Sequence, residues 1–191
     1  MLVAAVCAQL PLSEPDCKTG LVTWFDLVVR DSILDEIGAV GTARIAWIRV
    51  AEAMNRGVAV RSMLATAGLA DLDELFFDAT MNCLKAPFHN TLGWDVMFVA
   101  ELGVTDIWRK KNVEEAIVLR MLETWAETCA IVVLPISERS DAVRWHRLAF
   151  QSAREPTADR RGYLYLDRSA KRPRLRDRDG DGRCFEIDEM V

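Results

Sequence analysis

The chain has 191 residues, of which 51% are hydrophobic and 28% are charged, and its formal net charge is −5 at pH 7. This length and composition predict one domain, with or without a tail, that buries an ordinary hydrophobic core. The acidic balance argues against a general nucleic-acid binder. No apolar run reaches the roughly 20 residues of a membrane-spanning helix.

An apolar run at residues 1–10 opens the chain and contains the first of five irregularly spaced cysteines. Signal peptides begin with a basic segment, which this run lacks, so we expect a buried strand over residues 2–10. The cysteines form no C-x-x-C pair, and free thiols indicate a reducing, cytoplasmic environment. The two histidines are too few for a histidine-based zinc site.

Apolar residues at helical spacing dominate the N-terminal half, after a loop at residues 11–20 that contains proline and glycine. Spacings of three and four residues place such side chains on one face of a helix. Residues 58–68 fit either a strand or a short helix. The predicted helices cover residues 21–37, 43–56 and 71–84.

The pattern changes after Gly93, where runs rich in β-forming residues alternate with amphipathic segments. The clearest element is a helix that enters from a basic turn and precedes a short, continuously apolar strand. This order favours a layered α+β or α/β domain over a helical bundle. The predicted elements are a strand at 94–104, a helix at 113–129, a strand at 130–136, a helix at 141–152 and a strand at 162–166.

The basic turn reads Trp-Arg-Lys-Lys-Asn at residues 108–112 and runs directly into the predicted helix. Free backbone N–H groups and the positive end of the helix dipole favour a bound phosphate at such a position. A solvated turn is the alternative, because Glu114 and Glu115 also favour a helix N-terminus.

From residue 104 the chain reads V-T-D-I-W-R-K-K-N-V-E-E-A-I, and residues 145–150 read W-H-R-L-A-F. Both segments resemble motifs of the GNAT acetyltransferase superfamily, V-x-P-x-aromatic-R-x-x-G-x-G before a helix and Y-x-x-L-G-F after the next strand. The resemblance implies an α+β fold with a mixed central sheet flanked by helices, here with a helix-rich N-terminal half. We expect this domain to span residues 1–168, followed by a charged tail at 169–191.

The resemblance also implies a donor and a reaction. Acetyl-CoA would lie between strands 94–104 and 130–136 as they splay apart, and an amine, on a small molecule or a protein, would accept the acetyl group. The expected contacts to the CoA pyrophosphate come from residues in and around the basic turn, namely Val104, Trp108, Arg109, Lys110, Lys111, Asn112 and Val113.

Catalysis of this kind needs a group that removes a proton from the amine. Glu101 and Asp95 are candidate bases, because alternation places both on one face of the predicted strand. Tyr163, on the last predicted strand, is a candidate proton donor. The alternatives are an exposed strand face for the two carboxylates and a packing role for the tyrosine.

Four positions depart from the family motifs: Asp106 replaces the proline, Asn112 and Glu114 replace the two glycines, and Trp145 replaces the tyrosine. A carboxylate at Glu114 would repel a pyrophosphate. These departures favour a second hypothesis, an inactive relative or an unrelated α/β interaction module. In that case, the basic segment 154–176 would dock a protein partner.

The C-terminus carries an independent signal. Asp177, Asp179 and Asp181 occupy positions 1, 3 and 5 of a loop of the EF-hand type, with glycine at position 6. Arg183 would offer its carbonyl at position 7, and Asp188 its carboxylate at position 12. The sequence therefore predicts a calcium site, and the alternative is a disordered tail of alternating charge.

Overall fold

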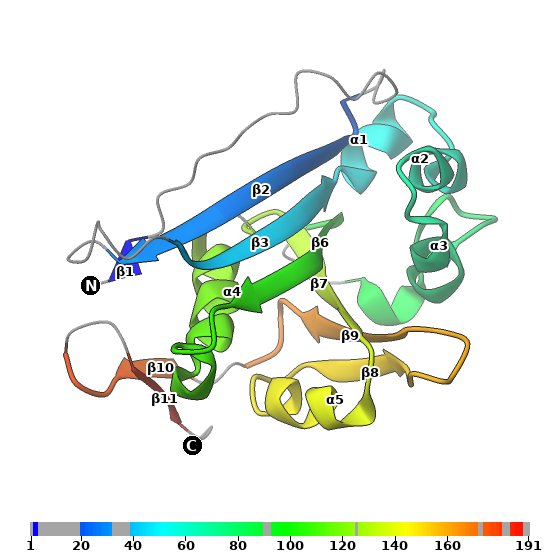
Figure 1. Ribbon diagram of the computed structural model, residues 1–191. Helices are drawn as coiled ribbons and strands as arrows, with labels where there is room; N and C mark the ends of the chain where they lie inside the picture. Colours follow the sequence, from blue (N-terminus) through cyan, green and yellow to red (C-terminus); the bar gives the residue numbers. More distant parts are fainter. Residues whose placement is uncertain are drawn as a thin grey trace.

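The fold is centred on a mixed seven-stranded sheet with the order β1-β2-β3-β6-β7-β9-β8 (Figure 1). The computed structural model describes residues 2–3, 20–31, 39–89, 93–124, 126–171, 174–180 and 184–188. The strands are β1 (Leu2–Val3), β2 (Val22–Asp31), β3 (Ala39–Ile48), β6 (Asp95–Val104), β7 (Cys129–Ile136), β8 (Gln151–Arg154) and β9 (Gly162–Asp167).

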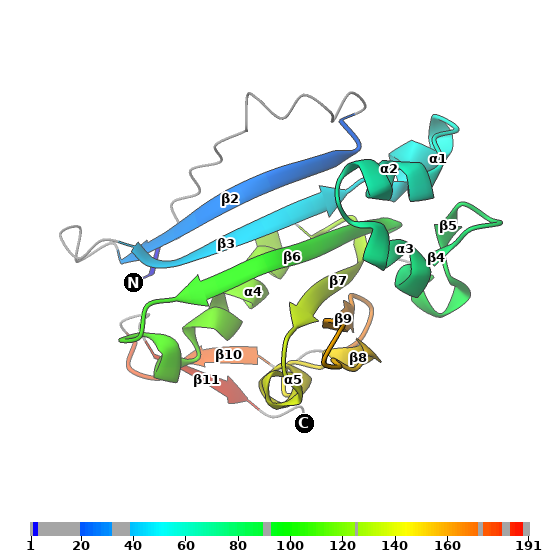
Figure 2. The ribbon, with the colours of Figure 1, turned by 45° about the vertical axis from the view of Figure 1, so that its right-hand side comes forward.

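Helices cover both faces of this sheet (Figure 2). One face packs against α4 (Val113–Thr124) and α5 (Arg139–His146), and the other against α1 (Val50–Asn55), α2 (Val60–Thr66) and α3 (Ala70–Phe76). The central strand β7 is buried on both sides, since Val132 and Leu134 face the first core while Ile131 and Val133 face the second. The mixed sheet flanked by helices confirms the predicted α+β fold.

The structure contradicts the predicted helices at 21–37 and 43–56. Residues 22–31 form β2 and residues 39–48 form β3, which pair as an antiparallel hairpin, and among the described residues of both ranges only 50–55 are helical. Leu27 and Val29 face the α4 side of the sheet, while Trp24 packs on the opposite side. Apolar side chains on both faces of a strand imitate helical spacing, which explains the error.

Other boundaries were also predicted incorrectly. The predicted helix 71–84 ends at Phe76 and continues into a short hairpin, β4 (Phe77–Asp78) and β5 (Cys83–Leu84), before the 3₁₀ turn η2 (Ala86–Phe88). The helix predicted at 113–129 ends at Thr124, because Cys129 already belongs to β7. The helix predicted at 141–152 gives way to β8. The ambiguous segment 58–68 contains α2, and of the strand predicted at 2–10 only Leu2–Val3 lies within the described residues.

The strands predicted at 94–104, 130–136 and 162–166 are confirmed as β6, β7 and β9. Strands β6 and β7 run parallel and pair from Asp95 with Cys129 to Phe98 with Val133. Beyond Phe98, β6 continues to Val104 and β7 to Ile136 without pairing to each other. The two strands therefore part over their C-terminal halves, as the family resemblance implied.

The C-terminal residues form a second hairpin, β10 (Arg174–Asp177) with β11 (Phe185–Asp188). Its Phe185 and Ile187 pack against the core that α4 covers. The division of the chain after residue 168 stays a prediction. Within the described residues, no helix is both long enough and apolar enough to cross a membrane.

Candidate functional site

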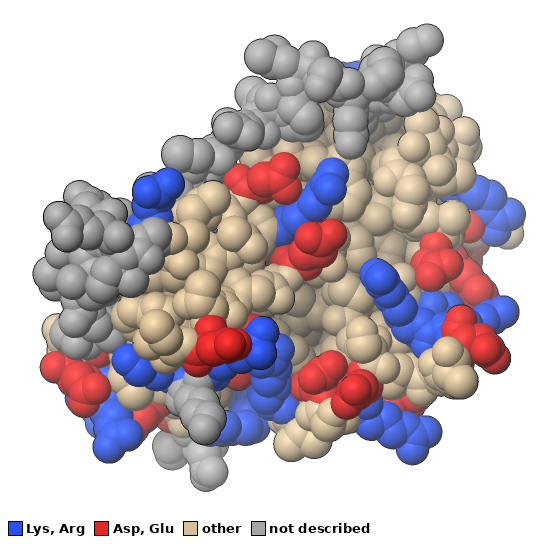
Figure 3. All heavy atoms as spheres, viewed as in Figure 1, with Lys and Arg blue, Asp and Glu red and all other residues tan. Residues whose placement is uncertain are grey.

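A pocket of about 430 Å³ opens on the α2–α3 side of the sheet, next to the point where β6 and β7 part. Phe98, the last residue of β6 that pairs with β7, lines it. An adjoining hollow of about 260 Å³ shares Trp24, Ala100 and Glu101 with the pocket. Figure 3 shows acidic and basic side chains interspersed around a hollow on this face. The polar residues that line the pocket are Asp71, Glu101, Arg161 and Tyr163.

Glu101 reaches this pocket because β6 carries one extra residue. Arg44 of β3 pairs with Glu101 and Ile45 pairs with Val99, which leaves Ala100 without a partner on β3. A bulge of this kind reverses the alternation of side chains beyond it. Glu101 therefore lies on the opposite face from Val99, and the prediction that Asp95 and Glu101 share one face is wrong.

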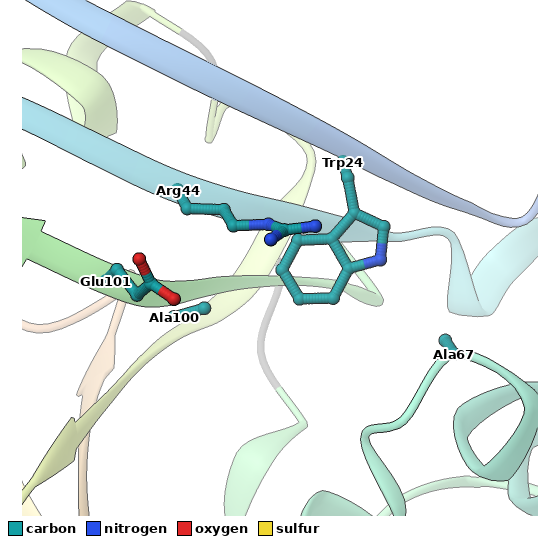
Figure 4. Close-up of a pocket in the computed structure, with 5 residues that line it drawn as sticks. All are labelled: Trp24, Arg44, Ala67, Ala100 and Glu101. Atoms are coloured by element: carbon teal, nitrogen blue, oxygen red, sulfur yellow. The ribbon is translucent and has the colours of Figure 1, made fainter. Parts of the chain in front are cut away.

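Arg44 lies across the strand from Glu101, at the edge of the same hollow (Figure 4). Its guanidinium lies over the Trp24 ring, 5.0 Å from the centroid, and its Nε is 3.7 Å from Oδ1 of Asp26. An arginine over an indole combines apolar packing with cation–π attraction. This end of the site therefore offers an aromatic face and charges of both signs.

Tyr163 lines the other side of the pocket, on β9. Its hydroxyl donates a hydrogen bond to Oδ2 of Asp71 at 3.1 Å, and the Arg154 guanidinium lies 4.9 Å from its ring centroid. Burial, followed by the nearby Asp71 carboxylate, raises the pKa of the Tyr163 phenol above its usual value. Tyr163 therefore keeps its proton at neutral pH. The structure brings it together with Glu101 around one pocket.

Asp95 lies elsewhere, buried at the start of β6. Its carboxylate accepts hydrogen bonds from Trp47 Nε1 at 3.3 Å, from Ala51 N at 3.2 Å and from Thr128 Oγ1 at 3.2 Å. The Ala51 amide belongs to the first turn of α1, where helical N–H groups need an acceptor. These bonds give Asp95 a structural position, and the structure does not bring it to the pocket.

The predicted phosphate loop, which we call the donor loop (residues 105–112), connects β6 to α4. Val104 before it, Trp108 within it and Val113 after it are buried. Arg109, Lys110 and Lys111 form a 3₁₀ turn, η3. An ion pair of 3.1 Å joins Arg109 Nη1 to Asp106, and Lys111 Nζ lies 4.6 Å from the Trp108 ring centroid.

Asn112 closes the donor loop in the left-handed conformation, with φ 52° and ψ 31°. Asparagine tolerates this region better than most residues, so it replaces the motif glycine without breaking the turn. Its Nδ2 donates a hydrogen bond of 2.7 Å to the carbonyl of Phe185. The donor loop is thereby tied to the C-terminal hairpin.

Replacing Asn112 tests both features. Asn112→Ala should lower the free energy of unfolding by about 2 kcal/mol, because it loses the hydrogen bond and places a Cβ-bearing residue without a polar side chain at positive φ. Asn112→Gly loses only the hydrogen bond, so its cost should be about 1 kcal/mol. Urea denaturation of the two variants measures the difference, and equal costs would contradict the backbone argument.

Glu114 and Glu115 occupy the first turn of α4, and both are buried. The Glu114 carboxylate forms an ion pair with the Arg144 guanidinium of α5. Burial raises the pKa of Glu115, against the opposing effects of its own backbone N–H and of Arg144. Two carboxylates of the chain therefore already lie at the positive end of α4, and in this arrangement the donor loop does not fit a pyrophosphate.

The predicted calcium ligands are not all brought together. Asp181 and Arg183 lie outside the described residues, and Asp177 Oδ1 accepts a hydrogen bond from the Gly180 amide at 3.0 Å. Asp177 pairs with Phe185, so Asp188 lies three residues further along β11, about 10 Å away at roughly 3.3 Å per residue. Asp179 is in the turn. The described part of the chain contains no group of three or more His, Cys, Asp or Glu that could hold a metal ion.

The basic segment 154–176 is not a free arm, because it includes β9 and the first residues of β10. Arg154 Nη2 lies 3.5 Å from Asp71, and Arg168 Nε donates to the Ala126 carbonyl at 3.1 Å. Docking of a protein partner through this segment stays a prediction.

The sequence analysis missed three residues of the site, namely Trp24, Arg44 and Asp71. Trp24 lies in the range 21–37 that was predicted as a helix, and Asp71 was predicted only as the first residue of the helix at 71–84. A correct prediction of the β2–β3 hairpin would have been the signal, since the paired strands carry Trp24 and Arg44 on the face that Glu101 shares.

The comparisons with known proteins show only structures with a similar overall fold. No family model and no curated protein matches the chain. Among solved structures, Arabidopsis thaliana NAA60 in complex with acetyl-CoA is 14% identical, with a TM-score of 0.46 and 77% of each chain covered. The polyamine N-acetyltransferase of Drosophila melanogaster, which forms N-acetylagmatine, is 12% identical, with a TM-score of 0.43 and 74% of each chain covered. Neither donor nor substrate follows from likeness at this level.

Proposed function

We propose that the protein transfers an acyl group from an acyl-CoA thioester, such as acetyl-CoA, to an amine bound in the pocket beside Glu101. One observation carries the proposal: Glu101 and Tyr163 line a single pocket at the point where β6 and β7 part. The parting of the two strands leaves backbone groups of β6 beyond Phe98 unpaired to β7, which supports a donor lying between them.

The chain's own residues supply acid–base chemistry at this point. A bound amine is protonated at neutral pH, and Glu101 can accept that proton directly or through one water. The free amine nitrogen then forms a bond to the thioester carbonyl carbon, and the carbon–sulfur bond breaks. Tyr163, whose raised pKa keeps its phenol protonated, can supply the proton that the departing thiolate takes up. The second proton of the amine nitrogen, lost as the amide forms, then reprotonates the Tyr163 phenolate through water.

The pocket also indicates the charge of the acceptor. The carboxylates of Asp71 and Glu101 attract a cation, and the Trp24 ring offers a surface on which a cation can lie. Arg44 and Arg161 at its margins exclude acceptors that carry positive charge along their whole length. An amine with one cationic end and a neutral or acidic remainder suits this distribution.

A protein of the same fold that binds ligands without catalysis is the second candidate. The observation in its favour is the pair of carboxylates, Glu114 and Glu115, buried where a donor phosphate would lie. In that case the pocket would bind an amine and leave it unchanged.

The test incubates purified protein with acetyl-CoA and four amine classes: a diamine, an amino acid, a guanidino-amine and a peptide N-terminus. Released thiol and acetylated product are quantified together. We expect amine-dependent thiol release with matching product for at least one class. No product from any class, with an amine nonetheless bound in calorimetry, would overturn acyl transfer and favour the second candidate.

Tyr163→Phe should lower kcat by about 10²-fold, because the ring packing is kept while the proton donor is lost. Tyr165→Phe is the matched control, since Tyr165 lies on the same strand, bonds Gln151 Oε1 at 2.7 Å and does not line the pocket. Its kcat should stay within twofold of the parent. Equal losses in the two variants, measured by steady-state kinetics, would refute a role for the Tyr163 hydroxyl in proton transfer.

A further inference from the structure

Several of the charged side chains around the pocket are paired within the chain. Oδ2 of Asp71 lies 3.5 Å from Nη2 of Arg154 and also accepts the hydrogen bond of the Tyr163 hydroxyl. Arg44 has Asp26 as its counter-charge, 3.7 Å from its Nε. These charges are therefore balanced by neighbours before any ligand arrives.

Two charged side chains that line the pocket differ from these. Within the described part of the chain, no ion pair or hydrogen bond joins the side chain of Glu101 or of Arg161 to another group. Both residues are exposed. The pocket therefore presents one carboxylate and one guanidinium that a ligand can pair with.

The strand register places these two charges on opposite sides of the opening between β6 and β7. Glu101 lies three residues beyond Phe98, and Ile136 lies three residues beyond the β7 partner of Phe98. Ile136 pairs with Gly162 of β9, which follows Arg161 directly. Glu101 and Arg161 are thus at about the same level along the sheet, with β7 between them. Two strand spacings of about 4.8 Å set their backbones about 10 Å or more apart.

The backbone of Arg161 is held firmly, although its side chain has no such partner. Arg154 Nε donates a hydrogen bond of 3.1 Å to the Arg161 carbonyl. Backbone hydrogen bonds of 2.9 and 3.3 Å close the turn at residues 157–160. A Cβ at Gly162 would lie 2.6 Å from Pro156, so the chain packs closely there. The guanidinium therefore extends from a fixed point and can meet a ligand without first leaving another group.

We propose that the acceptor is a small zwitterion, an amine that carries a carboxylate in the same molecule, and that Arg161 binds this carboxylate. The inference rests on the proposed function, in which Glu101 takes the proton of the amine and so marks the amine end. The planar fork of an arginine can donate two parallel hydrogen bonds to one carboxylate. The volume of about 430 Å³ is near the lower end of the roughly 300–1,000 Å³ of small-molecule sites, which suits a free amino acid better than a polymer.

The position of Arg161 also disfavours a diamine as acceptor. Burial and then the Asp71 carboxylate raise the pKa of the Tyr163 phenol, whereas the charges of Arg154 and Arg161 oppose that rise. The charge of Arg161 therefore acts at the centre of the pocket. A second ammonium group on the acceptor would meet this charge and be repelled, while a carboxylate there is attracted.

Calorimetric titration without a donor tests the proposal with glycine, 4-aminobutyrate and 6-aminohexanoate, each compared with its carboxamide. The carboxamide keeps the size of the acid and lacks its charge. We expect at least one acid to bind about 10- to 100-fold more tightly than its carboxamide, as a charge-assisted pair would produce. Three chain lengths are used because the spacing between Glu101 and Arg161 sets which acid fits.

Arg161→Gln should remove this preference by weakening the acid about 10- to 100-fold, with carboxamide affinity changed by less than about threefold. Arg160→Gln is the matched control, because it removes the same charge one residue away, and Arg160 does not line the pocket. If Arg161→Gln does not fold, Arg161→Lys keeps the charge but loses the planar fork, so it should reduce the preference.

Equal affinity for acid and carboxamide at all three lengths would overturn the proposal, and so would a preference that survives in folded Arg161→Gln. Tighter binding of a peptide amide with an acidic second residue than of any free acid would overturn the small acceptor. A preference that depends on Arg161, without acetyl transfer to any of these amines, would support this site and overturn the proposed function. Equal rates of acetyl transfer to acids and carboxamides would do the reverse.

Discussion

Glu101→Gln should lower kcat for acyl transfer by about 10²- to 10³-fold, with the KM of the amine changed by less than about threefold. Glutamine keeps the size and polarity of the side chain, so the pocket and the β6 bulge should persist. It cannot accept a proton, however, so the amine must lose its proton to solvent. Steady-state kinetics at saturating donor measures both constants.

The pH profile separates this role from simple attraction of the amine. Loss of a base should make the residual rate of Glu101→Gln rise with pH, as the free amine becomes more abundant, whereas loss of attraction alone should raise KM. Glu74→Gln is the matched control, because Glu74 is an exposed carboxylate on α3 that does not line the pocket. A kcat for Glu101→Gln equal to that of the control would remove Glu101 from the mechanism.

The C-terminal half of the fold could be predicted because each element there carries a single dominant pattern. Strand β7 is continuously apolar and lies between two helical layers, and α4 carries apolar residues at helical spacing along its length. The N-terminal hairpin could not be predicted in this way. Both of its strands carry apolar side chains on two faces, and only pairing between residues such as Trp24 and Ala46 distinguishes a strand from a helix.

The site was predictable only in part for a related reason. Glu101 was selected from its place on a strand near the predicted opening, and that strand exists. The feature that turns Glu101 toward the pocket is the extra residue Ala100, which becomes visible only when β3 and β6 are paired. The same bulge separates Glu101 from Asp95. A prediction that alternates side chains strictly along a strand cannot foresee that a bulge reverses the two faces.

The burial of Glu114 shows what the sequence could not reveal about a residue that it did single out. From the sequence, a carboxylate in the first turn of α4 repels a phosphate and argues against a donor. The structure adds Arg144, thirty positions later in the chain, as its partner. An unpaired carboxylate and one that is neutralised by an ion pair look alike in sequence, and only the contact between the two helices distinguishes them.

Asp95→Ala should lower the free energy of unfolding by about 3 kcal/mol or more, because three donors lose their acceptor in a buried place. The donors are Trp47 Nε1, Ala51 N and Thr128 Oγ1, which belong to β3, to α1 and to the turn before β7. One carboxylate thus ties together three separate segments at the end of the sheet. Chemical denaturation of parent and variant measures the loss.

Asp95→Asn provides the decisive comparison with the earlier interpretation of Asp95 as a base. Its amide oxygen can still accept from the α1 backbone, so we expect a loss of only about 1 kcal/mol. If Asp95 is structural, folded Asp95→Asn should keep kcat within about threefold of the parent, whereas removal of a catalytic base costs 10²-fold or more. A stable Asp95→Asn protein with such a loss of kcat would return Asp95 to the mechanism. Stability would then depend on the hydrogen-bond acceptor that asparagine keeps, and catalysis on the negative charge that it lacks.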